Sequence, residues 1–210
     1  MSEEKKENEY KKFSDPLSIA QRTSQKIHFV ADHDKAMLLV HLLKIDKLEN
    51  IVVVVKTKKG ADTLQKILDK EGISAKTIHA NKGMTESKNS LKSFNDKETS
   101  VLIVTDSFLA SARFTGIDYI VSFNLPLEVE DYLVRMGVLE ESGEGIAFVS
   151  EEEQDLMDGI EWKMKVEIAV EKVEGFSDTP KPHTERKVKD KTKKPRHRKT
   201  KRKGQDQEDT

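Results

Sequence analysis

The sequence of 210 residues contains no cysteine, which excludes disulfide frameworks, cysteine-ligated zinc or iron–sulfur sites and thiol catalysis. No apolar run approaches the ~18–20 residues that a membrane-spanning helix needs, so we expect no membrane partner. The charged start, MSEEKKENEYKKFSD, lacks the apolar stretch of a secretory signal. We therefore expect a cytoplasmic protein, and the initial Met followed by this arm favours a complete chain.

Hydrophobic residues are also scarce, at 35% of the chain, and they collect between residues 26 and 174. The length allows one domain of roughly 100–200 residues with room for disordered ends. We expect a flexible N-terminal arm at 1–23, a folded domain at 24–176 and a disordered basic tail at 177–210, because the two ends lack apolar periodicity.

Six short apolar runs alternate with segments of helical spacing. The runs lie at residues 27–31, 51–55, 75–79, 101–104, 119–123 and 146–149. This alternation predicts an α/β domain of three layers, with a mostly parallel sheet of about six strands and helices on both faces. The acidic stretch at 151–155 is typical of a helix start, and Val166, Ile168 and Val170 indicate a short extended segment.

Several catalytic and nucleotide-binding motifs are missing from the loops that would follow the strands. The chain has no GxxxxGK[ST] or GxGxxG loop, no HExxH, no GxSxG and no histidine pair at metal spacing. A self-contained NTPase, hydrolase or metalloenzyme finds no support, and we expect no metal site. Lysines and hydroxyl residues at the strand ends could hold phosphates or could simply cap and brace turns.

Five motifs in order carry a resemblance to a known family. They are Val52–Lys58 followed by Ala61-Asp62, Ile78–Asn81 with Leu91 and Phe94, Val101–Asp106, Ile120–Pro126 and Tyr132–Val138. Residues ~24–175 thereby resemble the C-terminal RecA-like domain of DEAD-box RNA helicases. The resemblance implies a RecA-like fold that grips the RNA backbone. The RNA-binding positions that it implies are Thr57, Lys58, His79, Thr105, Asp106 and Arg135.

The departures from the family pattern fall on its functional positions. The family's RNA-gripping Gln and Arg are Met84 and Ser87, and an arginine of a later motif is Ala110. Two arginines that face the nucleotide phosphates in the family are Val138 and Glu141. An arginine finger is worth about 10³–10⁵ in rate, and the domain with the phosphate loop is missing from this chain. We therefore expect a degenerate ATPase site, no catalytic residue and no bound cofactor.

The tail carries the clearest charge signal. Residues 1–179 hold 24 Lys and Arg against 33 Asp and Glu, whereas residues 180–210 hold 13 against 5. A dense basic cluster without aromatic residues favours sequence-tolerant binding of RNA phosphates. Its members are Lys187, Lys189, Lys191, Lys193, Lys194, Arg196, Arg198, Lys199, Lys201, Arg202 and Lys203. The alternatives are a solubilising tail and a tail that folds back on the acidic body.

These observations favour a non-catalytic, helicase-C-like RNA-binding or adaptor protein. One alternative is half of an ATP-dependent RNA helicase, completed by a separate N-terminal helicase domain that would bring ATP. Another is a protein-interaction module. Trp162 and Phe176 are expected to be packing anchors, and Met136, Met157 and Met164 to lie in the core.

Overall fold

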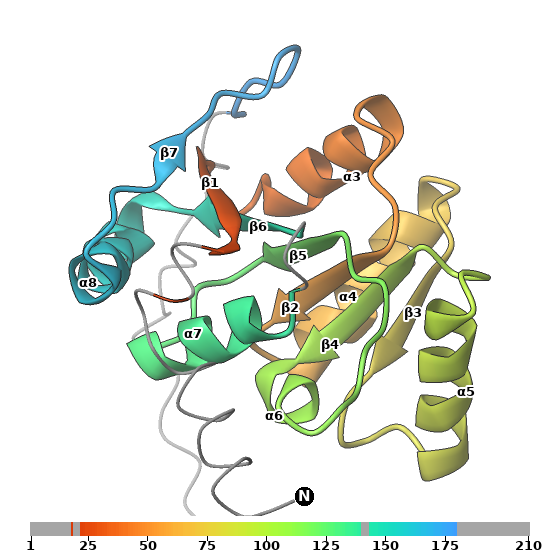
Figure 1. The fold of residues 1–210 in the computed structure, drawn as a ribbon. Coiled ribbons are helices and arrows are strands. Elements are labelled where there is room, and N and C mark those ends of the chain that lie inside the picture. The colour runs from red at the N-terminus through yellow and green to blue at the C-terminus, as the bar shows by residue number, and fades with distance from the viewer. Residues whose placement is uncertain (1–17, 19–21, 140–142, 180–210) are drawn as a thin grey trace, which may run out of the picture.

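The computed structural model describes residue 18, residues 22–139 and residues 143–179 (Figure 1). Most of the predicted N-terminal arm and nearly all of the predicted basic tail lie outside the described residues, as does Glu141. In the described part of the chain, no helix is long and apolar enough to cross a membrane.

One parallel sheet organises the domain, with its strands in the order β3-β4-β2-β5-β6-β1-β7. This architecture confirms the predicted α/β class and parallel sheet. The sheet has seven strands rather than about six, because Ala169 and Val170 pair with β1 inside the segment expected to be extended. The strands are β1 (Ser24–Phe29), β2 (Ile51–Val55), β3 (Ala75–Ile78), β4 (Val101–Thr105), β5 (Tyr119–Ser122), β6 (Glu144–Val149) and β7 (Ala169–Val170).

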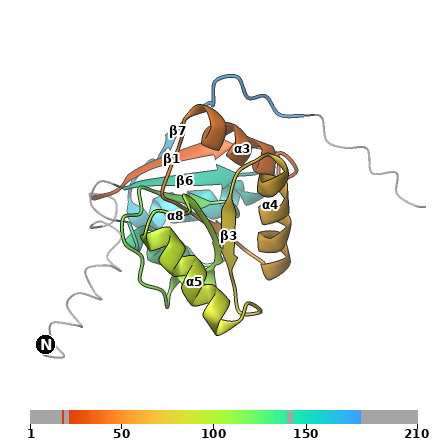
Figure 2. The ribbon, with the colours of Figure 1, turned by 90° about the vertical axis from the view of Figure 1, so that its right-hand side faces the viewer.

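Helices cover both faces of the sheet (Figure 2). α3 and α4 pack on one face, whereas α5, α6, α7 and α8 contribute to the core on the other. A 3-10 turn, η1 (Glu151–Glu153), precedes α8, as the acidic stretch predicted. The helices are α3 (Lys35–Ile45), α4 (Lys58–Lys70), α5 (Met84–Asn95), α6 (Asp106–Leu109), α7 (Val129–Gly137) and α8 (Gln154–Met164).

The central strand β2 shows why the sheet needs both layers. All five of its side chains are at most 1% exposed. Ile51, Val53 and Val55 belong to the core under α3 and α4, and Val52 and Val54 belong to the opposite core. Successive side chains of a strand point to opposite faces, so a strand that is apolar throughout must be covered on both.

The core predictions for methionine are confirmed, whereas the one for tryptophan is wrong. Met136, Met157 and Met164 are at most 1% exposed. Trp162 is 82% exposed, because it lies on the solvent side of α8. Phe176 is half-buried, and its ring contacts His41 edge-on at a centroid distance of 5.8 Å.

Candidate nucleic-acid interface

Because all the strands are parallel, the loops after β2, β3, β4 and β5 meet at one edge of the sheet. In the first loop, Thr57 caps α4, and its Oγ1 accepts a hydrogen bond from Gly60 N at 3.0 Å. A Cβ on Gly60 would also lie 3.0 Å from this oxygen, so glycine suits the close turn. Lys58 Nζ donates to Asn81 Oδ1 at 2.8 Å and thereby joins the loops after β2 and β3.

His79 directly follows β3, and its buried side chain connects the loop after β3 to α4. Its Nε2 lies 3.0 Å from Asp62 Oδ1 on α4, and its Nδ1 accepts from Asn81 N at 3.3 Å, so Nε2 is the donor to Asp62. This hydrogen bond lowers the pKa of Asp62 below its ordinary value. The ionised carboxylate therefore contributes stability above its unfolded-state pKa, and that stability is lost as the pH falls through the depressed value.

Arg135 on α7 and Asp106, the first residue of α6 directly after β4, form a bidentate ion pair. Arg135 is fully buried; its Nε donates to Asp106 Oδ1 at 2.7 Å and its Nη2 to Asp106 Oδ2 at 2.9 Å. Its Nη1 donates to the carbonyl oxygen of Asn124, after β5, at 2.6 Å. The guanidinium thus fastens the segments after β4 and β5 to α7 and uses its donors inside the protein.

The six predicted RNA-binding residues are therefore gathered at one edge but differ in exposure. Thr57 and Lys58 are exposed and Asp106 is half-buried. His79, Thr105 and Arg135 are buried, at 4%, 7% and 0% exposure. In this arrangement the three buried side chains hold loops in position. A phosphate would meet the exposed side chains of the first loop. Their role in RNA binding stays a prediction.

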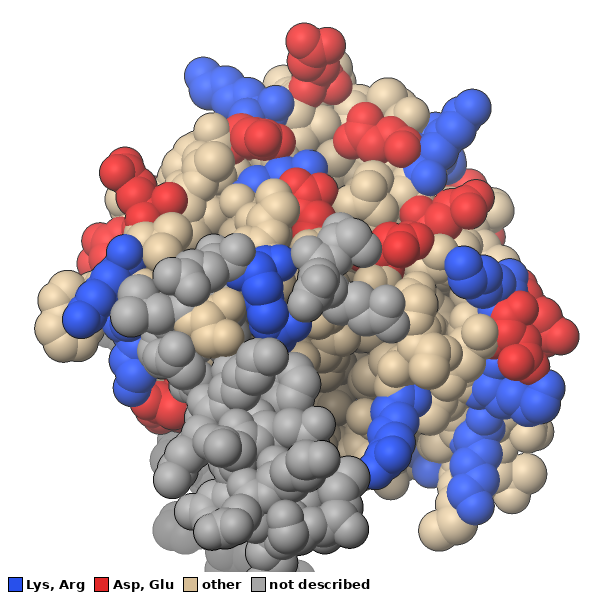
Figure 3. All heavy atoms as spheres, viewed as in Figure 1, with Lys and Arg blue, Asp and Glu red and all other residues tan. Residues whose placement is uncertain are grey.

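Three exposed lysines follow β2 directly, at the N-terminal end of α4. Lys56, Lys58 and Lys59 add their charge to the positive end of the helix dipole, which suits a phosphate. Elsewhere the charges are mixed. Figure 3 shows acidic and basic side chains interspersed on one face, with several basic side chains at the lower right.

Positions where the resemblance expects polar groups are apolar at the surface. Met84 at the start of α5 is 75% exposed, and Val134 on α7 is 43% exposed. Val138, which replaces an expected arginine, is half-buried just after α7. None of these three side chains carries a charge.

A second network of ion pairs and hydrogen bonds at the strand ends was not predicted from the sequence. Lys35 at the start of α3 is fully buried, and its Nζ pairs with Glu153 Oε2. The same carboxylate accepts from Leu125 N at 3.2 Å and from Ser150 N at 3.1 Å, so it ties the ends of β5 and β6 to α3. The Ser150-x-x-Glu153 spacing of a capping box was a usable signal for Glu153. Nothing local signalled Lys35, which lies 118 residues from its partner.

Among the described residues, no three His, Asp or Glu side chains are arranged to hold a metal ion.

Comparison with known proteins agrees with this geometry. The family model described as "Helicase conserved C-terminal domain" matches residues 34–137. The ATP-dependent RNA helicase RhlB of Xanthomonas campestris pv. campestris strain B100 is 28% identical over 170 residues. That match covers 80% of this chain and 30% of RhlB, so the chain spans less than a third of this curated relative.

Two solved structures are similar in fold. The E. coli DEAD-box protein SrmB bound to regulator of ribonuclease activity A superposes with a TM-score of 0.68 at 20% identity, over 72% of this chain and 91% of that chain. S. cerevisiae Dbp5 bound to RNA and ADP BeF3 gives a TM-score of 0.66 at 20% identity, over 75% of this chain and 42% of that one.

Proposed function

Since this chain carries a helicase C-terminal domain, the RecA-like C-terminal domain of DEAD-box RNA helicases, we propose that it acts as an RNA-binding or adaptor protein without ATP hydrolysis of its own. The domain places a scaffold of braced loops at one sheet edge. The tail supplies most of the contacts to RNA phosphates. The proposed location is the cytoplasm, with no resident cofactor.

The charge of the tail is the observation that carries this proposal. Residues 187–203 contain eleven Lys and Arg and a single acidic residue, Asp190. Such a cluster releases counterions when it neutralises phosphates, and this gives tight, salt-sensitive binding of low sequence specificity. The exposed lysines 56, 58 and 59 at the start of α4 add a smaller patch of the same sign.

Loss of fixed positive charge supports the absence of independent ATP hydrolysis. Phosphoryl transfer needs cations against the charge that develops in the transition state. Val138 supplies none, and Glu141 reverses the sign of the position that it occupies. Arg135, the arginine retained in this motif, is buried and paired with Asp106.

The tail is tested by replacing Lys193, Lys194, Lys199 and Lys201 with Gln in the full chain and measuring affinity for a structured RNA across a salt series. Each lost phosphate contact removes roughly 0.7–0.9 from the magnitude of the slope of log affinity against log salt, so with four lysines replaced the magnitude should fall by up to roughly 3–4. Affinity at low salt should fall at least about tenfold.

Four exposed lysines of the body serve as the matched control. Lys47, Lys70, Lys97 and Lys172 also lie on the surface but outside the strand-end loops, so their replacement by Gln removes the same charge. We expect a slope close to that of the wild type. Equal effects of the two variants would contradict a role for the tail beyond general charge.

One observation favours a second candidate, half of a split helicase. The Arg135–Asp106–Asn124 network keeps the strand-end architecture intact, and the relative RhlB is an ATP-dependent RNA helicase. This candidate predicts RNA-stimulated ATP hydrolysis when a separate N-terminal helicase domain is added, increased by Val138→Arg with Glu141→Arg. Absence of hydrolysis with both the wild type and that variant would rule it out.

A further inference from the structure

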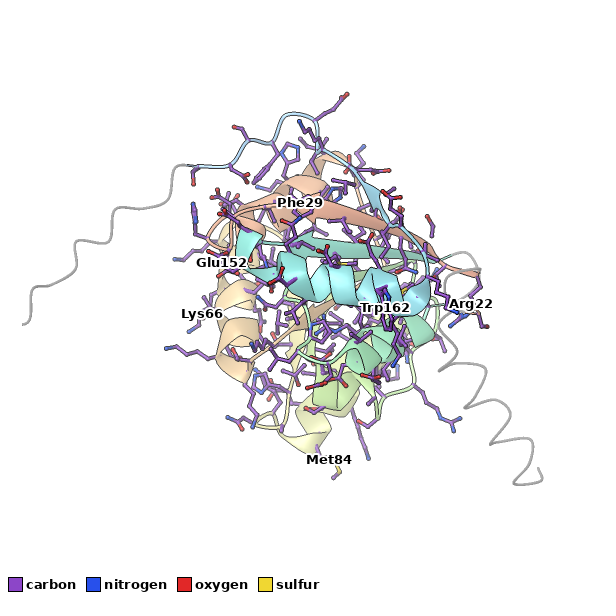
Figure 4. The ribbon with its side chains drawn as sticks, turned by 90° about the vertical axis from the view of Figure 1, so that its left-hand side faces the viewer. Arg22, Phe29, Lys66, Met84, Glu152 and Trp162 are labelled. Carbon is purple, nitrogen blue, oxygen red and sulfur yellow. The ribbon has the colours of Figure 1, made fainter. Side chains whose placement is uncertain are left out.

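One face of α8 has no partner in the described structure. Asp155, Asp158 and Trp162 follow the i, i+3, i+7 spacing that places side chains on one face of a helix, and all three are exposed. Trp162 is 82% exposed, and neither aspartate pairs with a cation among the described residues. Figure 4 shows α8 crossing this side of the sheet, with Glu152 at one end and Trp162 toward the other.

The charges around this stripe fit a cation and oppose a nucleic acid. Glu151 and Glu152 extend the acidic surface beyond the start of α8. Lys163 is paired with Glu130 of α7, and Lys165 lies at the far end of the helix. Lys and Arg side chains both pair with carboxylates and stack on the face of an indole ring, preferring Trp among the aromatics.

The described chain ends beside the start of this helix. Thr179 donates from its backbone N to Asp34 Oδ2 at 2.6 Å and from its Oγ1 to Asp34 Oδ1 at 2.8 Å. Asp178 lines the same pocket as Glu151 and Glu152. The basic cluster begins at Lys187, and eight residues can span up to about 29 Å. The distance from Asp155 to Trp162 along a helix is only about 10 Å, so the cluster can cover the whole stripe.

We propose that the basic segment 187–203 of the same chain docks on this face of α8, with its Lys and Arg side chains on Asp155, Asp158 and the ring of Trp162. Charge complementarity and the exit point of the tail together select this occupant. Docking itself is independent of RNA. Its consequence rests on the proposed function. RNA phosphates and the face of α8 compete for the same Lys and Arg side chains, so docking weakens RNA binding. Docking also reduces the binding of other anions that have only weak affinity for the tail.

Trp162 is the only tryptophan of the chain, so its fluorescence reports on its own face. The experiment compares acrylamide quenching of the full-length wild type with that of Asp155→Asn/Asp158→Asn, at about 0.01 M and about 1 M salt. At low salt we expect stronger quenching in the variant, because its tail no longer shields the ring. At high salt the two proteins should coincide, because the Debye length falls to about 3 Å.

Two further variants make this outcome specific. The tail variant, Lys193, Lys194, Lys199 and Lys201 to Gln, should reproduce the increase in quenching from the other side of the contact. Asp46→Asn/Asp69→Asn removes two exposed carboxylates near the C-terminal ends of α3 and α4 and should quench like the wild type. Unchanged quenching in either the α8 variant or the tail variant would overturn the proposal.

RNA affinity separates docking from the proposed function. At low salt, Asp155→Asn/Asp158→Asn should bind RNA about threefold to tenfold more tightly than the charge-matched Asp46→Asn/Asp69→Asn control. Lack of RNA binding by every protein would refute the proposed function and leave the fluorescence result standing. If the wild type binds RNA but acrylamide quenching of Trp162 does not increase in Asp155→Asn/Asp158→Asn, docking is refuted and the proposed function is not.

Discussion

At the scale of single residues, the candidate interface shows that a polar side chain at a position expected to bind RNA can instead stabilise the fold. Arg135 stands where the helicase resemblance expects an RNA- or nucleotide-facing region, yet it is fully buried against Asp106 and Asn124. A buried guanidinium is tolerated because its donors are satisfied by a carboxylate and a carbonyl. The residue therefore holds the segments after β4 and β5 in place whether or not RNA contacts them.

Removal of this guanidinium should be costly. Arg135→Ala leaves the carboxylate of Asp106 without its partner and opens space under α7, so we expect a loss of about 3–5 kcal/mol in the free energy of unfolding. Urea denaturation of the full chain measures it. Arg113→Ala, at an exposed arginine of the loop before β5, is the control and should change stability by less than about 0.5 kcal/mol. Similar losses in both variants would contradict the assigned role of Arg135.

At the scale of elements, α7 approaches β6 closely because residue 145 has no side chain. A Cβ at Gly145 would lie 2.6 Å from Met136 Sδ and 3.3 Å from Gln25 Cγ. Met136 is fully buried, so it has little room to move away. In contrast, Gly159 on α8 has no atom within 4 Å of the corresponding position. The close packing of α7 on β6 therefore requires glycine at residue 145, whereas α8 has space for a side chain at residue 159.

This difference gives opposite predictions for two substitutions. Gly145→Val should destabilise the domain by about 1–3 kcal/mol, because the added methyls overpack the contact between α7 and β6. Gly159→Ala should stabilise it by about 0.5–1 kcal/mol, because alanine loses less backbone entropy in a helix. Thermal and urea unfolding measure both changes. Tolerance of valine at 145 would show that α7 can shift away from the sheet.

At the scale of the whole molecule, two oppositely charged parts meet at the end of the described chain. The body carries an excess of nine acidic residues and residues 180–210 an excess of eight basic ones. Their junction at Thr179 is anchored to Asp34, next to the start of α8. Under the proposed function and the proposed docking, salt and the exposed charges of α8 set the balance between the tail's binding to RNA and its binding to the body.

The sequence by itself determined the α/β class, the position of six strands and the core methionines, because hydrophobic periodicity is local. It also determined where positive charge accumulates. Its error at Trp162 has a simple cause: this residue lies two positions from the buried Ile160, and 200° of helical rotation places it on the opposite side.

Only the tertiary structure decided which polar residues are partners. Arg135 and Asp106 are 29 residues apart, and Lys35 and Glu153 are 118 residues apart. Parallel strands bring such distant loops to one edge, and burial there selects the pairs that satisfy one another's charge. The same packing leaves Asp155, Asp158 and Trp162 exposed on α8, and the start of this helix lies near Thr179, where the described chain ends. Sequence spacing predicts the stripe, but its nearness to the tail follows from the fold.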